Sequence, residues 1–162
     1  GDMMKKLSKL LFITIIGLLF FGLAYGQFAK PNDAIMYRQS VMTIIGHHMG
    51  QMGAVVTGKK PYEKQEFSHN ASVMEPLSTL PWEAFMAPGS VKGKTKLKSS
   101  ALREIDEFMA KAKTFETDIQ KLVKVSAGDD FNAIKAQFGE VAKSCKSCHH
   151  DYRSKEACLI GC

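Results

Sequence analysis

Apolar residues recur every three or four positions along four stretches of this chain, which is the spacing of one face of an α-helix. The first predicted helix starts near Pro31, a residue suited to a first helical turn, and ends at Gly58. The second covers residues 63–80 and contains Pro76. Because proline lacks the backbone N–H that a helix interior uses, we expect a bend or a break at Pro76.

The third predicted helix covers residues 99–125, and the fourth runs from about residue 131 to Tyr152. Asp129 or Asp130 can cap the free amides at the start of the fourth helix. No stretch alternates between apolar and polar residues as a strand does. Four amphipathic helices of these lengths predict an all-α fold, an antiparallel four-helix bundle with up-down-up-down topology.

The beginning of the chain is typical of an export signal. Lysines precede an uninterrupted apolar run at residues 10–25, and small residues follow at Ala24 and Gly26. Basic, apolar and small residues in this order indicate a signal peptide. A membrane anchor is the alternative, but the run is shorter than the roughly 20 apolar residues that a spanning helix needs. We therefore predict that residues 1–26 are cleaved and that the mature protein is periplasmic and free of the membrane.

The rest of the chain predicts a single bundle at residues 27–155 and a tail of unknown role at residues 156–162, with Cys158 and Cys162. The formal net charge is +6. The lysines are scattered among acidic residues without an arginine cluster or an aromatic platform, so nucleic acid is a poor candidate partner. No general base or substrate pocket can be identified, so we predict that the protein is not an enzyme.

The sequence "SCKSCHHDYR" near the end of the chain has the c-type haem attachment pattern in Cys145, Cys148 and His149. Each thiol adds to one vinyl group of the porphyrin, and the two intervening residues hold both sulfurs on one side of the ring. The next residue then directs its imidazole to the iron as an axial ligand. We therefore predict one covalently bound haem c per chain, on the last helix of the bundle.

Three other uses of these cysteines are open. A redox-active dithiol requires a strand before the pair and a helix beginning at the first cysteine, which an all-helical chain does not offer. Four thiolates could bind a structural zinc ion if Cys158 and Cys162 joined the pair. A disulfide is chemically possible after export, but it leaves His149 without a purpose.

The mature chain resembles the cytochrome c′ family, the class II c-type cytochromes. The resemblance lies in "QFAKPNDAIMYRQSVM" at the start, "LSTLPWEAF" before the long loop, and "FGEVAKSCKSCHHDYR" at the end. It implies a periplasmic homodimer of four-helix bundles. It also implies a five-coordinate haem with His149 below the iron and an empty apolar distal face that binds nitric oxide and carbon monoxide but discriminates against oxygen.

The resemblance also assigns roles to individual residues. Arg38, Gln39 and Thr95 would meet the haem propionates, and Arg153 would lie on the proximal face beside His149. Met42 would occupy the distal position above the iron. Trp82 and Phe85 would complete the distal pocket close to the ring. The loop end "TKLKSSAL" departs from the family, because it lacks the proline and tryptophan often found there.

Met42 separates two functions. As a core residue it leaves the iron five-coordinate, which gives a gas-binding protein that takes part in electron transfer or in protection against nitric oxide. As an iron ligand it gives a six-coordinate, low-spin electron carrier that meets redox partner proteins. The first function is favoured by the predicted distal stripe, which contains no His, Asn or Gln to stabilise bound oxygen.

Overall fold

The computed structural model describes residues 28–154. The predicted signal peptide at residues 1–26 and the tail at residues 156–162, with Cys158 and Cys162, lie outside the described residues. The helices are α2 (Pro31–Val56), α3 (Lys64–Thr79), α4 (Trp82–Met86), α5 (Ser100–Arg103), α6 (Ile105–Ser126) and α7 (Phe131–Tyr152).

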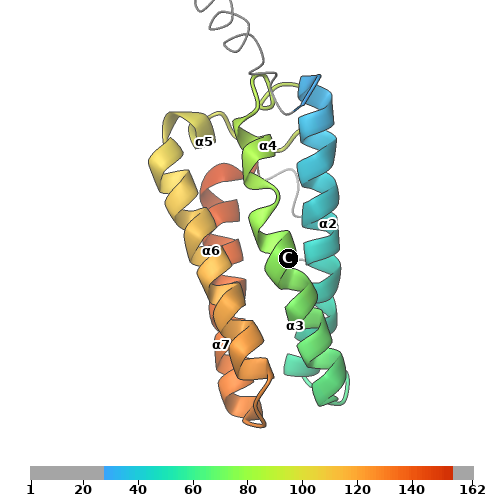
Figure 1. Cartoon of the computed structure of the whole chain (residues 1–162). Helices are drawn as coiled ribbons and strands as arrows, with labels where there is room; N and C mark the ends of the chain where they lie inside the picture. Colours follow the sequence, from blue (N-terminus) through green and yellow to red (C-terminus); the bar gives the residue numbers. More distant parts are fainter. Residues whose placement is uncertain (1–27, 155–162) are drawn as a thin grey trace, which may run out of the picture.

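The long helices α2, α3, α6 and α7 run alternately down and up and form the predicted antiparallel bundle (Figure 1). Helix α6 packs against α7 and α3, and α3 packs against α2. Helices α2 and α7 make the least contact of the neighbouring bundle pairs. One seam of the bundle is therefore less closed by direct helix contact than the others.

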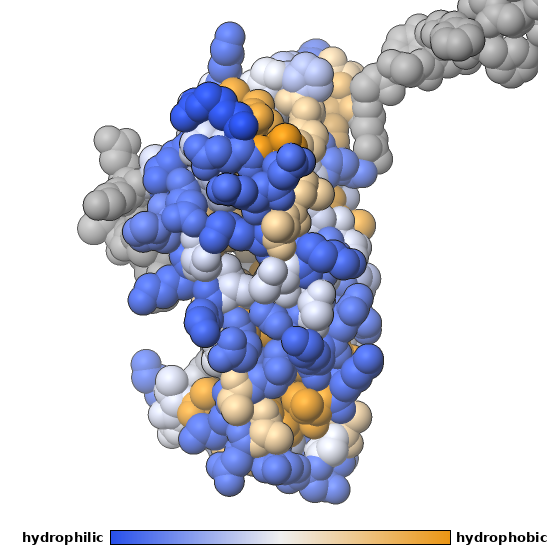
Figure 2. Space-filling view, turned by 90° about the vertical axis from the view of Figure 1, so that its left-hand side faces the viewer, coloured by the Kyte–Doolittle hydropathy of each residue, from blue (hydrophilic) through white to orange (hydrophobic). Residues whose placement is uncertain are grey.

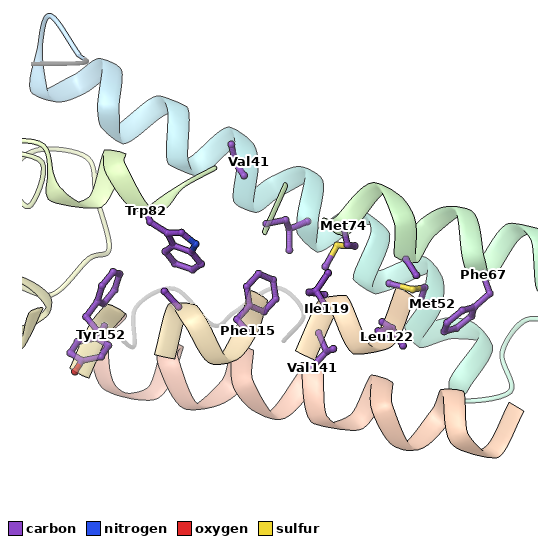
Figure 3. Packing of buried hydrophobic residues seen from close by; sticks show 14 of the residues in the cluster. Val41, Met52, Phe67, Met74, Trp82, Phe115, Ile119, Leu122, Val141 and Tyr152 are labelled. Carbon is purple, nitrogen blue, oxygen red and sulfur yellow. The ribbon is translucent and has the colours of Figure 1, made fainter. Parts of the chain in front are cut away.

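One apolar cluster fills the bundle from end to end, as Figure 3 shows for the labelled side chains. Phe67 lies near one end and Tyr152 near the other. The predicted stripes supply the cluster, because residues three or four apart share one face of a helix. The fully buried members include Met74, Ile119 and Val141.

The third predicted helix is divided, so our expectation of one continuous helix over residues 99–125 was wrong. The backbone of Glu104, at φ −112° and ψ 45°, leaves the helical region and separates α5 from α6. The backbone N–H of Lys98 donates to the carbonyl of Tyr152 at 2.9 Å, which fixes the approach to α5. A hydrogen bond between distant segments thus accompanies the start of this helix pair. Helical periodicity in the sequence gives no signal for such a bond.

We expected a bend or a break at Pro76; no break occurs, because α3 continues through this residue to Thr79. Pro76 is exposed and lies in the last turns of the helix, so only the end of the hydrogen-bond ladder is affected. The long loop that follows α3 contains the short helix α4.

The start of α7 provides a test of the predicted cap. The Asp130 carboxylate accepts from the backbone N–H of Asn132 at 2.9 Å and of Ala133 at 3.1 Å. We expect Asp130→Ala to lower the free energy of unfolding by about 1 kcal/mol, because these amides lose their acceptor. Asp129→Ala is the matched control, because Asp129 makes only an exposed ion pair with Lys64. Chemical denaturation of both variants measures the difference, and equal effects would contradict the assignment of the cap to Asp130.

The face of the molecule that carries α5 and α6 is mostly hydrophilic, with small apolar spots (Figure 2). Leu102 and Met109, which are each 38% exposed, belong to these helices. Across residues 28–154, no helix combines the length and the apolar character that crossing a membrane would require.

Candidate haem site

Helix α7 places the two motif cysteines on its inner face. Cys145 and Cys148 are three residues apart, so they lie on neighbouring turns of the same side of the helix. Both are partly buried free thiols that pack against the apolar core. The helix therefore presents two adjacent sulfur atoms to the bundle interior, immediately before His149.

The environment of the thiols does not suit a redox dithiol. Burial raises the pKa of Cys145 to about 11, with a further contribution from the neighbouring Cys148. Burial also raises the pKa of Cys148 to about 11, against the opposing charge of Lys111. Reactive cysteines have a lowered pKa instead. The pair also lies deep within α7 rather than at its start, which disfavours the dithiol interpretation.

His149 lies in the last turn of α7. Its side chain is exposed, but the neighbouring chain removes part of its hydration, which lowers the pKa of the imidazole. The charge of Arg153 lowers this pKa further. The neutral imidazole is the form that ligates a metal. The position of Arg153 on the proximal side of a haem stays a prediction.

A polar contact that the sequence did not reveal ties the motif to α6. Lys111 donates to the hydroxyl of Ser147 at 2.7 Å and pairs with the carboxylate of Asp151 at 3.0 Å. Ser147 lies between the two motif cysteines, and Asp151 follows one turn later, so Lys111 spans the motif. The only available signal was the i, i+4 spacing of Ser147 and Asp151, which does not specify a partner on another helix.

Arg38 is the most unusual side chain of the site. It is only 2% exposed, and its guanidinium makes no ion pair with a described carboxylate. It donates to the carbonyls of Ala84 at 3.0 Å and Ser90 at 2.6 Å and to the hydroxyl of Thr95 at 2.7 Å. Burial lowers the pKa of Arg38. A buried cation without an anion is costly, so an acidic group at this position would stabilise Arg38, and the described residues do not supply one.

The other two predicted propionate residues lie beside Arg38. The Thr95 hydroxyl accepts from Arg38 and from the backbone N–H of Leu97 at 3.2 Å, which leaves its own O–H free to donate. The Gln39 amide donates to the carbonyl of Lys94 at 3.0 Å. The structure therefore brings Arg38, Gln39 and Thr95 together, although the loop around Thr95 departs from the family pattern.

Trp82 and Phe85 lie together beside Arg38, and Met42 packs against the same apolar cluster. Met42 and Phe85 are partly buried and pack against the apolar cluster, and the Arg38 guanidinium lies 4.9 Å from the centre of the Phe85 ring. Trp82 stacks on Phe85 with ring centres 5.9 Å apart, and Figure 3 shows it between α2 and the α6–α7 pair. Its indole N–H is buried and has no hydrogen-bond partner. An indole N–H of this kind usually finds an acceptor.

These observations fit a haem group in the seam between α2 and α7. The elements around this seam supply two thiols from α7, a buried cation from α2 that lacks an anion, and an unpaired indole N–H from α4. A porphyrin has two carboxylates for the cation and two vinyl groups for the thiols. The described residues contain no cluster of three or more His, Cys, Asp or Glu that could hold a metal ion directly.

The comparisons with known proteins agree with this geometry. The family model for cytochrome c′ matches residues 33–153. The cytochrome c′ of Alcaligenes xylosoxydans xylosoxydans is 39% identical over 130 residues, which are 80% of this chain and all of that protein. The chain belongs to the cytochrome c′ family. Proteins of this family are haem proteins rather than enzymes and are typically periplasmic, and membership implies haem c.

Solved structures of cytochrome c′ have the same fold. The structure of cytochrome c′ from Shewanella frigidimarina superposes with a TM-score of 0.78 at 36% identity, covering 80% of this chain and all of that one. A nitric oxide complex of a variant of the Alcaligenes xylosoxidans protein superposes with a TM-score of 0.74 at 39% identity and covers 80% of this chain and 99% of that one. The all-α bundle predicted from helical periodicity is thereby confirmed.

Proposed function

We propose that this protein is a periplasmic c-type haem protein whose five-coordinate iron binds nitric oxide and carbon monoxide. One haem c per chain is attached through Cys145 and Cys148, and His149 is the axial ligand. The observation that carries the proposal is the position of this motif on the inner face of α7, in a chain of the cytochrome c′ family. A relative 39% identical in sequence has been solved as a nitric oxide complex.

The residues on α2 and in the loop between α4 and α5 would hold the haem carboxylates. The guanidinium of Arg38 has five N–H donors, of which the protein uses three. The remaining donors and the free O–H of Thr95 can bind a propionate, and Gln39 borders the same position. A charge-assisted hydrogen bond to a carboxylate is about twice as strong as a neutral one, so the propionate would also relieve the buried charge of Arg38.

The distal residues control which gas binds. The haem supplies an iron atom that binds diatomic gases, and Met42 and Phe85 would border the open side of the ring with apolar groups. His48 is a partly buried base on α2, but it lies on another side of the helix from Met42, and its ring nitrogen is 2.7 Å from the side-chain oxygen of Asn70. Bound oxygen is stabilised by a hydrogen-bond donor on the distal side. The predicted distal stripe of α2 has no such donor, which favours binding of nitric oxide and carbon monoxide.

The outer face of α2 supports the homodimer. Met36 is 66% exposed and Ile44 is 45% exposed, and both belong to this face. Gly46 and Gly50 follow Ile44 along α2, and both have open space where a side chain would stand. Exposed apolar residues beside small ones allow two helices to approach closely, so we assign this face to contact with a second copy.

Absorption spectra of the matured protein test the coordination of the iron. We expect a high-spin ferric spectrum, and nitric oxide added to the ferrous protein should shift the Soret band. Met42→Leu should leave the ferric spectrum unchanged, because a core residue of similar volume is replaced. A low-spin spectrum with a methionine–iron band that disappears in Met42→Leu would establish the six-coordinate electron carrier instead. Absence of any Soret band would overturn both functions.

A further inference from the structure

The loop between α4 and α5 carries a concentrated positive charge. Its segment "VKGKTKLK", residues 91–98, has a lysine at every second position and no acidic residue. Lys92, Lys94 and Lys96 are exposed, and none of them forms an ion pair with a described residue. We call these three residues the lysine loop. Their charges are uncompensated locally, in contrast to the paired lysines on α6 and α7.

The lysine loop is fixed to α2 at the position of the proposed propionates. Thr95, between two of the lysines, accepts from Arg38, and the carbonyl of Lys94 accepts from Gln39. Gly93 has a φ of +99°, and a side chain there would approach α2. The backbone that carries the three lysines therefore lies in a defined position beside the residues proposed to hold the propionates.

The other side of the lysine loop is fixed to the end of the haem helix. The backbone N–H of Ser154 donates to the carbonyl of Lys96 at 2.9 Å, and Leu97 pairs with Arg153. The loop thus connects both proposed haem contacts, the propionate side on α2 and the proximal side on α7. A haem held between these contacts would have the loop along one edge.

The surroundings favour an acidic protein over other anionic partners. A groove next to the loop, of about 510 Å³, is lined by Lys98 together with Glu104, Glu107 and Asp151. Positive and negative patches side by side orient a protein partner, because one part of its acidic surface is attracted and another is repelled. No large apolar side chain of the loop is exposed, so insertion into a lipid surface is less suitable.

We infer that the lysine loop is the docking surface for an acidic one-electron carrier protein. The inference rests on the proposed haem site, because the loop borders the residues assigned to the propionates. The reduced partner binds through carboxylates to Lys92, Lys94 and Lys96 and transfers one electron to the ferric haem. The products are the oxidised carrier and the ferrous protein, and no bond is made or broken.

Electron transfer from a reduced plant-type [2Fe–2S] ferredoxin, used as an acidic probe, tests the inference. We expect the combined variant Lys92→Gln, Lys94→Gln and Lys96→Gln to lower the second-order reduction rate constant about tenfold at low ionic strength, because steering by local charge is lost. The difference should disappear at about 0.5 M salt, where exposed charges are screened. Stopped-flow absorbance at the Soret band measures the rate.

A matched variant removes the same charge at the opposite end of the bundle. Lys59→Gln, Lys60→Gln and Lys124→Gln change exposed residues in the loop after α2 and at the end of α6 (Figure 1). Its rate constant should change by less than about twofold. Equal effects of the two variants, or no effect of either, would overturn the docking surface. Loss of binding to vesicles of phosphatidylglycerol and phosphatidylcholine in the lysine-loop variant, with an unchanged rate, would assign the loop to a membrane instead.

Measurements of the haem itself distinguish a failure of the docking surface from a failure of the proposed function. The Soret band and the response to nitric oxide are measured on the parent protein and both variants before the kinetics. If the parent lacks these signals, the proposed function fails. If all three proteins show them and the reduction rates are equal, only the docking surface fails.

Discussion

Cys145→Ala combined with Cys148→Ala is expected to abolish covalent haem attachment completely. Each sulfur forms one bond to the porphyrin in the proposed site, and no other described cysteine is available to replace them. Mass spectrometry of protein from cells that mature c-type cytochromes should give the polypeptide and one haem for the parent chain. The double variant should give the polypeptide alone, and the Soret band should be lost from the denatured protein after solvent extraction.

The tail offers a matched control with two other cysteines. Cys158→Ala combined with Cys162→Ala should keep the full haem content, because the attachment pattern in α7 is intact. If this variant lost the haem as completely as the α7 variant, the tail cysteines would also be needed for attachment, and the assignment of attachment to Cys145 and Cys148 alone would be wrong. A parent protein with the mass of the bare chain would contradict the haem site itself.

Arg38→Met is expected to cost about 3 kcal/mol of unfolding free energy in the haem-loaded protein. The buried carbonyls of Ala84 and Ser90 lose their donor, and unsatisfied buried groups cost about 1–3 kcal/mol each. Methionine keeps much of the side-chain volume, so a cavity contributes little. The haem reduction potential should also fall, because removal of a nearby positive charge stabilises the more positive ferric state.

Arg103→Met is the control for this experiment. Arg103 is exposed and donates only to the hydroxyl of Ser99 at 2.9 Å, so we expect a change below about 0.5 kcal/mol and an unchanged potential. Denaturation curves and potentiometric titrations separate two roles for Arg38. Lost stability with an unchanged potential would show that Arg38 only anchors the loop and does not hold a haem carboxylate.

The position of the attachment motif could be predicted because it is a local property. Cys145, Cys148 and His149 are close in the chain, and helical periodicity alone places the two cysteines on one face. The bundle itself was predictable for the same reason, since a stripe of apolar residues must be buried against another helix. Residues more distant along the chain were assigned by resemblance to the family, and their roles toward the haem stay predictions.

Three features of the structure could not be predicted from the sequence. Periodicity continued through Glu104, but a backbone bond from Lys98 to Tyr152 accompanies a break there. Proline chemistry indicated a bend or a break at Pro76, but α3 continues through this residue, which lies near an exposed helix end. The contact of Lys111 with Ser147 and Asp151 had no usable signal, because surface lysines have many possible partners.

The sequence by itself determined the helical bundle and the attachment motif on its last helix. Only the tertiary structure decided that Arg38 is buried without an anion, that Thr95 lies against it, and that the lysine loop joins both sides of the proposed haem position. The physical reason is the range of the interactions. Periodicity and motif spacing reflect neighbours within a few turns, whereas the burial of a charge depends on segments that meet only when the chain folds.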